Sequence, residues 1–191
     1  MRKTIRIGLI ALLCAALVVG YYYYLSHRDD HRSVEDTTQL TEVDKILTTD
    51  LSKDYPSSPR AVVKYYNRII TAFYGEKYSQ KELEQMADQA RSLMDEELLE
   101  HNSRAEYLTA LQADIADYAN REKKIVQSSV SDSDDITYAT IEGSYCAYVK
   151  AYYFCKEGNQ YSRTYQEFVL RRNEEGQWKI LSFRLTKGDE G

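Results

Sequence analysis

The sequence predicts an α+β protein, with an N-terminal transmembrane helix and then about three amphipathic helices packed on a curved antiparallel sheet of about four strands. Two observations support this class. Apolar residues recur at three- and four-residue steps between residues 58 and 118, and at two-residue steps after Lys124. The first period is typical of helices and the second of strands. Because all the helices precede the strands, the pattern favours α+β over alternating α/β units.

Length and composition limit the function classes. The chain has 191 residues, which suits one domain with an appendage. A hydrophobic share of 43% is too high for a disordered chain, and eight glycines and two prolines exclude collagen-like scaffolds. The net charge of -5 argues against a nucleic-acid partner, since phosphates are bound by clustered basic residues.

Residues 1–28 are predicted to form a basic cytoplasmic tip and a membrane anchor. Residues 7–25 are 19 positions without a charge, which as a helix span about 28 Å and match a hydrocarbon core of about 30 Å. Three basic residues precede this run, so the positive-inside rule puts the N-terminus in the cytoplasm. We therefore expect a single-pass protein of the cell membrane that contacts the bilayer through residues 7–25 and has an extracytoplasmic C-terminal domain.

The alternative for the N-terminus is a cleaved signal peptide, which requires small residues at its cleavage site. Residues 21–24 are four tyrosines and stand where that site would lie. A lipoprotein signal at Cys14 would need a small residue before the cysteine, and Leu13 is not small. The pattern favours an uncleaved signal-anchor.

Three segments follow the anchor. Residues 29–57 are rich in Asp, Thr and Ser and are predicted to form a tether with a short helical turn or two. Residues 58–187 form the α+β domain, and residues 188–191 a tail. Ser58 before Pro59 is a good N-cap and first-turn pair for the first helix, which ends at Gly75.

Capping boxes mark the next two helices. Ser79 with Glu82 opens a second helix whose apolar stripe runs to Leu98, and Ser103 with Glu106 opens a third. Four strands are predicted after them: residues 125–131, one long strand over 136–155 with a bend at Gly143, residues 161–172 and residues 177–186.

The long strand is apolar on both sides. Tyr145 and Tyr153 lie on the side expected to face the helices, so with Tyr66 of the first helix they are candidate ligand-binding residues. The other side is also mostly apolar, and we expect a homodimer or a membrane-protein partner to cover it. The residues assigned to this partner or dimer face are Tyr148, Lys150, Tyr152 and Trp178.

The sequence lacks the parts of common catalytic and metal sites. Its three histidines, His27, His31 and His101, have no expected catalytic partner, so no triad can be drawn and no catalytic residue is assigned. No cofactor or metal is expected, because the acidic turn at residues 132–135 lacks the glycine and distal glutamate of a calcium loop. Cys146 and Cys155 would lie about 30 Å apart on one extended strand, so no disulfide is expected.

Several stretches resemble an uncharacterised family of membrane-anchored proteins from clostridial bacteria. They are residues 54–67, Phe73-Tyr74, residues 95–99, residues 167–171 and residues 178–181. The order of helices, then a curved meander ending in Gly-x-Trp-Lys-Ile, also resembles the nuclear transport factor 2-like (SnoaL-like) cone fold. That superfamily includes hydrolases, isomerases, ligand binders and single-pass assembly components of secretion machines.

These observations lead to one hypothesis and two alternatives. The leading hypothesis is a non-catalytic, membrane-anchored extracytoplasmic module that binds a protein partner or small ligand through its helix–sheet cleft or its outer sheet face. The first alternative, which follows from the resemblance, is an assembly subunit of a conjugation or secretion complex. The second is a small cone-fold enzyme that uses Tyr145, Tyr153 or a buried carboxylate as acid or base.

Overall fold

A computed structural model describes residues 40–187, and the predicted membrane anchor lies outside the described residues. Within that range, no helix is long and apolar enough to cross a membrane. The α+β class is confirmed, with five α-helices and five strands in the described part of the chain. The elements are α2 (Glu42–Leu47), α3 (Pro59–Gly75), α4 (Gln80–Ser92), α5 (Glu96–Glu100), α6 (Arg104–Asn120), β1 (Lys123–Val130), β2 (Thr137–Ile141), β3 (Ser144–Glu157), β4 (Gln160–Arg172) and β5 (Trp178–Thr186).

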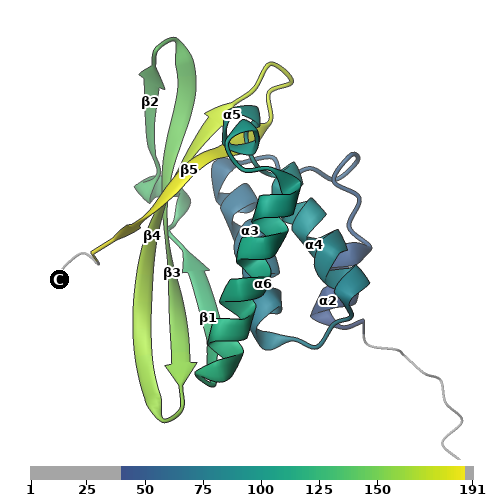
Figure 1. The fold of residues 1–191 in the computed structure, drawn as a ribbon. Helices are drawn as coiled ribbons and strands as arrows, with labels where there is room; N and C mark the ends of the chain where they lie inside the picture. Colours follow the sequence, from purple (N-terminus) through teal and green to yellow (C-terminus); the bar gives the residue numbers. More distant parts are fainter. Residues whose placement is uncertain (1–39, 188–191) are drawn as a thin grey trace, which may run out of the picture. The chain divides into compact units, whose positions relative to one another are not determined.

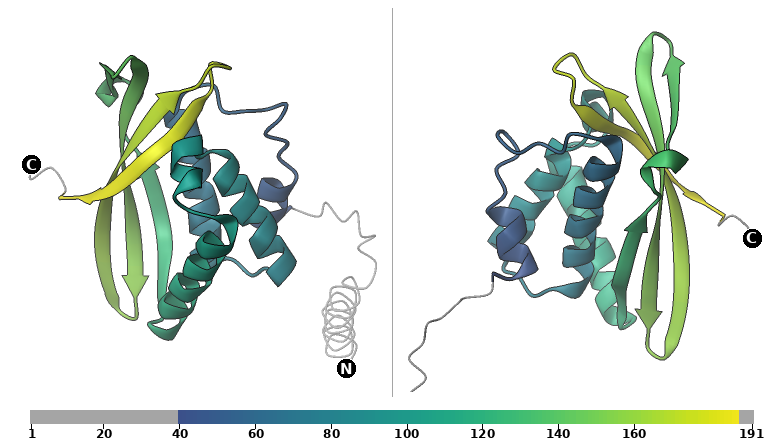
Figure 2. Two further views of the ribbon diagram at one scale, coloured as in Figure 1. Left: turned by 45° about the horizontal axis from the view of Figure 1, so that its top comes forward. Right: turned by 180° about the vertical axis from the view of Figure 1, so that it is seen from behind.

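The domain has two layers, with the helices gathered on one face of a twisted antiparallel sheet (Figures 1 and 2). The strand order is β1-β3-β4-β5, and β2 also pairs with β3. β1 pairs with the C-terminal half of β3 and β2 with its N-terminal half, so both lie on the side of β3 away from β4. We call the face toward the helices the inner face and the opposite one the outer face.

The three predicted helix starts are confirmed, and each has the expected cap. The Ser58 side chain accepts a hydrogen bond from the Ala61 amide, with Pro59 in the first turn of α3. At α4 the Ser79 amide donates to Glu82 Oε2 at 2.6 Å, and the Glu82 amide donates back to Ser79 Oγ at 3.3 Å. α6 begins with the same reciprocal pair between Ser103 and Glu106. Local sequence therefore determines where these helices begin.

The predicted second helix is wrong at its C-terminal end. α4 stops at Ser92, and residues 96–100 form a separate helix, α5. Between them the backbone bonds to strand β5: the Ile180 amide donates to the Leu93 carbonyl at 2.8 Å, and the Asp95 amide donates to the Ile180 carbonyl at 2.9 Å. These long-range bonds replace the helical ones, and the apolar stripe could not reveal them.

The predicted long strand over residues 136–155 is also wrong, because it is two strands joined by a tight turn. Glu142 and Gly143 have φ angles of 50° and 82° and form the turn between β2 and β3. Two consecutive residues with positive φ are the signature of a type I′ hairpin, which matches the twist of the strands it joins. The bend expected at Gly143 is thus a full reversal.

A bulge in β5 changes which of its side chains face the helices, and it makes the predicted position of Trp178 wrong. Leu170 pairs with Ile180 while Val169 pairs with Ser182, so Leu181 is an extra residue. An extra residue shifts the two-residue alternation by one. As a result Trp178 and Ile180 share the inner face with Phe183 and Leu185. Trp178, which the sequence assigned to the partner face, is 7% exposed and belongs to the core beneath the helices.

The core fills the space between the helices and the inner face. Its largest fully buried side chains include Phe73, Ile69 and Phe168, contributed by α3 and β4. Residues 42–47, which fall in the segment predicted as a tether, form helix α2 and bury Val43 and Ile46 in the same core.

Candidate ligand-binding site

A cleft of about 420 Å³ lies between helices α3 and α6 and the inner face of the sheet. This volume is within the range of roughly 300–1,000 Å³ that small-molecule sites occupy. Aromatic side chains dominate it. The lining residues used below are Tyr66 and Tyr74 of α3, Tyr107, Leu111, Asp114 and Tyr118 of α6, Tyr153 of β3, and Phe183 and Leu185 of β5.

The aromatic rings of the cleft pack on one another. Tyr74 and Tyr118 bring α3 and α6 together, with ring centroids 4.2 Å apart. Tyr66 contacts Phe183 at 6.2 Å and thereby joins α3 to β5. Lys123 Nζ lies 4.5 Å from the Tyr118 ring centroid, in a cation–π contact at one end of the cleft. The lining is a contiguous aromatic surface with phenol groups along it.

At neutral pH three of the cleft tyrosines, Tyr66, Tyr107 and Tyr153, are neutral phenols. Burial raises the pKa of Tyr66 and of Tyr153 far above the usual value of 10.0, and it raises the pKa of Tyr107 to about 12. The Tyr153 hydroxyl donates to Oδ1 of the buried Asn67 at 2.5 Å. Interaction with Tyr66 slightly opposes the rise in the pKa of Tyr107. These groups can donate or accept hydrogen bonds but are poor bases at neutral pH.

The cleft has little capacity for acid–base chemistry. Its one lining carboxylate, Asp114, is solvent-exposed. Among residues 40–187, every carboxyl group with a resolved pKa shift has a lowered pKa, as ion pairs and caps produce. His101 lies outside the cleft, where its Nδ1 is 2.9 Å from the Glu97 carbonyl oxygen next to α5. Within this range there is also no cluster of side chains suited to hold a metal ion.

The structure brings together two of the three predicted binding residues. Tyr66 and Tyr153 both line the cleft. Tyr145 does not line it, because it lies at the β2–β3 hairpin with 44% of its surface exposed. There it stacks on Tyr138 at 5.7 Å and contacts Trp178 at 5.5 Å.

The residues predicted for the partner face differ in burial: Lys150 is exposed, Tyr148 and Tyr152 are half-buried, and Trp178 is buried. Tyr148, Lys150 and Tyr152 lie on the outer face, which no described helix covers (Figure 2). Aromatic pairs cross it: Tyr152 with Tyr165 at 6.1 Å, and Phe154 stacked on Tyr161 at 5.3 Å. Cys146 is on this face and Cys155 on the inner one, and both are free thiols.

The predicted binding residues did not include four aromatic residues of the lining, Tyr74, Tyr107, Tyr118 and Phe183. Tyr107 is four positions before Leu111 and so shares a helix face with it, a signal that was present but not used. Tyr74 stands directly before Gly75, at the predicted end of the first helix, and is not among the predicted binding residues. Phe183 faces inward, as simple alternation from an outward Trp178 would place it, and the bulge at Leu181 puts Trp178 on the same inner face.

Fold and site together define an α+β domain in which helices cover one face of an antiparallel sheet and enclose an aromatic cleft. The chain belongs to a family described as a domain of unknown function, DUF6715, whose sequence profile matches residues 1–183. A comparison with functionally curated proteins gave no match.

Proposed function

We propose that the protein is a non-catalytic, membrane-anchored extracytoplasmic module that binds a small, largely apolar ligand in the cleft between α3, α6 and the sheet. The uncharged run at residues 7–25 and the basic residues before it support the anchor and its orientation. Helices followed by a twisted antiparallel sheet support the resemblance to the nuclear transport factor 2-like cone fold.

One observation carries the proposal: the cleft is lined by aromatic rings and neutral phenols rather than by an acid–base pair. Closely packed aromatic rings favour contact with an apolar or aromatic body, and phenols at their edges can fix its orientation by hydrogen bonds. The exposed fractions of Phe183 and Leu185, 42% and 69%, mark the rim at which such a ligand would enter.

Titration with the neutral fluorophore N-phenyl-1-naphthylamine tests this proposal on residues 40–191, the compact unit of the chain. We expect saturable fluorescence enhancement in the wild type. Phe183→Ala removes an exposed ring from the cleft and should weaken binding about tenfold, the effect of losing roughly 1.4 kcal/mol of apolar contact. Tyr161→Ala removes an exposed ring from the outer face, 58% exposed against 42% for Phe183, and is the control. Equal losses in the two variants would refute a cleft site.

A second candidate, self-association through the outer face, is favoured by the aromatic rows there. The face also carries both signs of charge: Arg184 pairs with Glu167 at 2.7 Å, and Lys150 lies opposite Glu167 in the β3–β4 register. Mixed charge suits a two-fold interface, in which the same surface meets itself. Light scattering during size-exclusion chromatography should then give a dimer that Tyr161→Ala weakens, and a concentration-independent monomer would rule it out.

A further inference from the structure

Helix α3 carries a basic stripe that contrasts with its surroundings. Residues 29–135 have 13 basic and 23 acidic side chains, yet α3 contains three basic residues and no acidic one. These residues, Arg60, Lys64 and Arg68, are spaced by four and therefore lie on one side of the helix. Like charges at this spacing repel one another weakly, and the partners of each residue decide how far that repulsion is offset.

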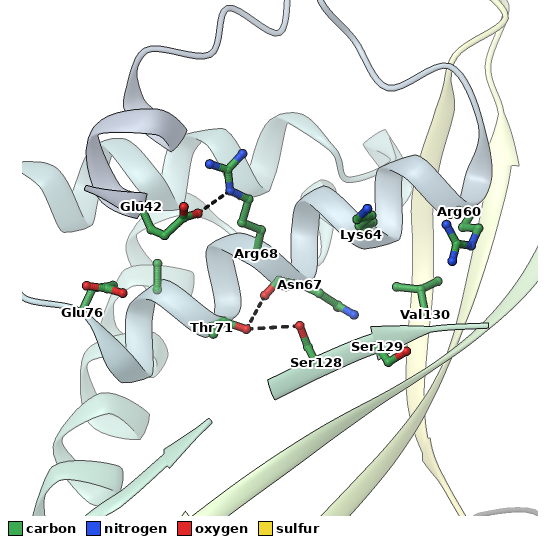
Figure 3. Close-up of a pocket in the computed structure, with 11 residues that line it drawn as sticks. Glu42, Arg60, Lys64, Asn67, Arg68, Thr71, Glu76, Ser128, Ser129 and Val130 are labelled. Carbon is green, nitrogen blue, oxygen red and sulfur yellow. Dashed lines mark hydrogen bonds and ion pairs between the residues drawn. The ribbon is translucent and has the colours of Figure 1, made fainter. Parts of the chain in front are cut away.

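The stripe borders a second cleft, of about 450 Å³, between α3 and strand β1 (Figure 3). Its lining shares no residue with the aromatic cleft. Among the described strands β1 pairs only with β3, so no strand occupies its other edge. The lining residues are Glu42, Arg60, Lys64, Asn67, Arg68, Thr71, Ala72, Glu76, Ser128, Ser129 and Val130.

Asn67 provides an unused hydrogen-bond donor in this cleft. The residue is only 1% exposed, and its Oδ1 accepts the Tyr153 hydroxyl, but its Nδ2 has no hydrogen-bond partner. Figure 3 shows the amide nitrogen pointing from α3 toward β1. A buried donor left without an acceptor costs about 1–3 kcal/mol. A ligand oxygen in the cleft would remove that cost.

The ion pairs of the cleft leave one cation for a ligand. Arg68 Nε donates to Glu42 at 2.7 Å. Arg60 Nε donates to the Ser131 carbonyl at 2.8 Å, and its Nη2 is 3.3 Å from Asp132. Lys64, between the two arginines, is exposed and makes no ion pair or hydrogen bond with any residue from 40 to 187.

Ser128 of β1 adds a hydroxyl group to the lining of the cleft, next to Thr71 of α3. Thr71 Oγ1 donates to the Asn67 carbonyl at 2.8 Å and lies 3.4 Å from Ser128 Oγ. The Ser128 hydroxyl can itself donate toward the cleft. An ammonium, an amide N–H and a hydroxyl therefore border one space, and each of them is a donor suited to a charged oxygen.

We propose that the α3–β1 cleft binds the oxyanion group, phosphate or carboxylate, of a small ligand, with Lys64 supplying the charge and Asn67 Nδ2 and the Ser128 hydroxyl supplying hydrogen bonds. This site goes beyond the proposed function, because it uses other residues and another ligand chemistry. Its success or failure does not depend on the aromatic cleft.

Titration calorimetry of the full chain in non-ionic detergent tests the proposal. Sodium phosphate and sodium acetate are the two probes, and sodium chloride holds the ionic strength constant. Lys64→Gln removes the ammonium group, and Lys81→Gln removes an exposed lysine that does not line the cleft. We expect saturable binding of one of the two anions that falls about tenfold or more in Lys64→Gln, the usual effect of losing a charged donor, and less than twofold in Lys81→Gln.

The anion that saturates identifies the ligand group, because phosphate alone indicates a phosphoryl ligand and acetate alone a carboxylate. Saturation by both anions, with the same dependence on Lys64, supports a general oxyanion site. If neither anion saturates, or if both lysine variants lose affinity equally, the proposal is overturned, since only non-specific surface charge would remain.

Discussion

Asp95 is a single residue that joins distant elements of the fold. Its carboxylate is almost fully buried and caps α5 by accepting a hydrogen bond from the Glu97 amide at 3.0 Å. It also accepts two hydrogen bonds from Arg171 of β4, one from Nη2 and one from Nε, the latter at 3.0 Å. Arg171 also pairs with the exposed Glu97 at 3.0 Å. One side chain therefore connects a helix start to the sheet.

Asp95→Ala should lower the free energy of unfolding by about 2–4 kcal/mol, because it removes a helix cap and leaves Arg171 without its buried partner. Glu97→Ala removes only the exposed partner and should cost less than about 1 kcal/mol. Denaturant unfolding of the two variants measures both values. Similar losses of unfolding free energy in the two variants would show that the buried Asp95–Arg171 pair stabilises the fold no more than the exposed Glu97–Arg171 pair.

Tyr107 makes stability depend on alkaline pH. Burial raises its pKa from the usual 10.0 to about 12, so the unfolded chain loses this proton at a lower pH than the folded one. The stability that the neutral phenol contributes is complete below pH 10 and is lost as the pH rises from 10 to about 12. Denaturant midpoints measured over this range should fall less steeply in Tyr107→Phe. An identical slope in the variant would contradict the assignment.

Helix and strand features that depend on neighbouring residues could be predicted from the sequence, whereas those that depend on long-range contacts could not. Helix starts could be predicted because a cap involves residues three positions apart, such as Ser79 and Glu82. The end of α4 could not, because it depends on bonds from Leu93 and Asp95 to Ile180. The faces of β3 follow simple alternation, whereas those of β5 are shifted by its bulge.

The β2–β3 hairpin offers a test of the turn that the sequence concealed. Glu142 has a φ of 50°, a conformation unfavourable for most side chains but tolerated by asparagine. Glu142→Asn creates the Asn-Gly pair preferred in type I′ turns and should stabilise the domain by about 0.5–1 kcal/mol. Thermal unfolding measures the gain, with Glu174→Asn in the β4–β5 loop as the control. A loss of stability would contradict the turn type.

For the whole molecule, the aromatic cleft was only partly predictable. The sequence placed Tyr66 and Tyr153 on facing elements, because helical and strand periodicity suffices for that. It did not show which part of β3 the helices cover: Tyr145 and Tyr153 share one face of the strand but are eight residues apart, about 26 Å in an extended chain, and only Tyr153 lines the cleft. The packing of α3 and α6 on the sheet determines which of the two can contribute.

The proposed membrane orientation can be tested with reporters fused after Lys187 of the full chain. An extracytoplasmic domain should give active alkaline phosphatase in a bacterial host and a non-fluorescent green fluorescent protein fusion. Replacing Arg2, Lys3 and Arg6 by glutamine removes the basic residues on which the proposed orientation rests and should lower phosphatase activity. The opposite reporter pattern in the unmodified chain would place the domain in the cytoplasm.

Mapping a bound probe by nuclear magnetic resonance tests whether the domain binds a ligand between its helices and its sheet. In ¹H–¹⁵N spectra of residues 40–191 titrated with N-phenyl-1-naphthylamine, we expect saturable shifts grouped on Tyr66, Tyr107, Tyr153 and Phe183. Shifts confined to Tyr152, Tyr161 and Tyr165 of the outer face, or shifts that never saturate, would contradict it.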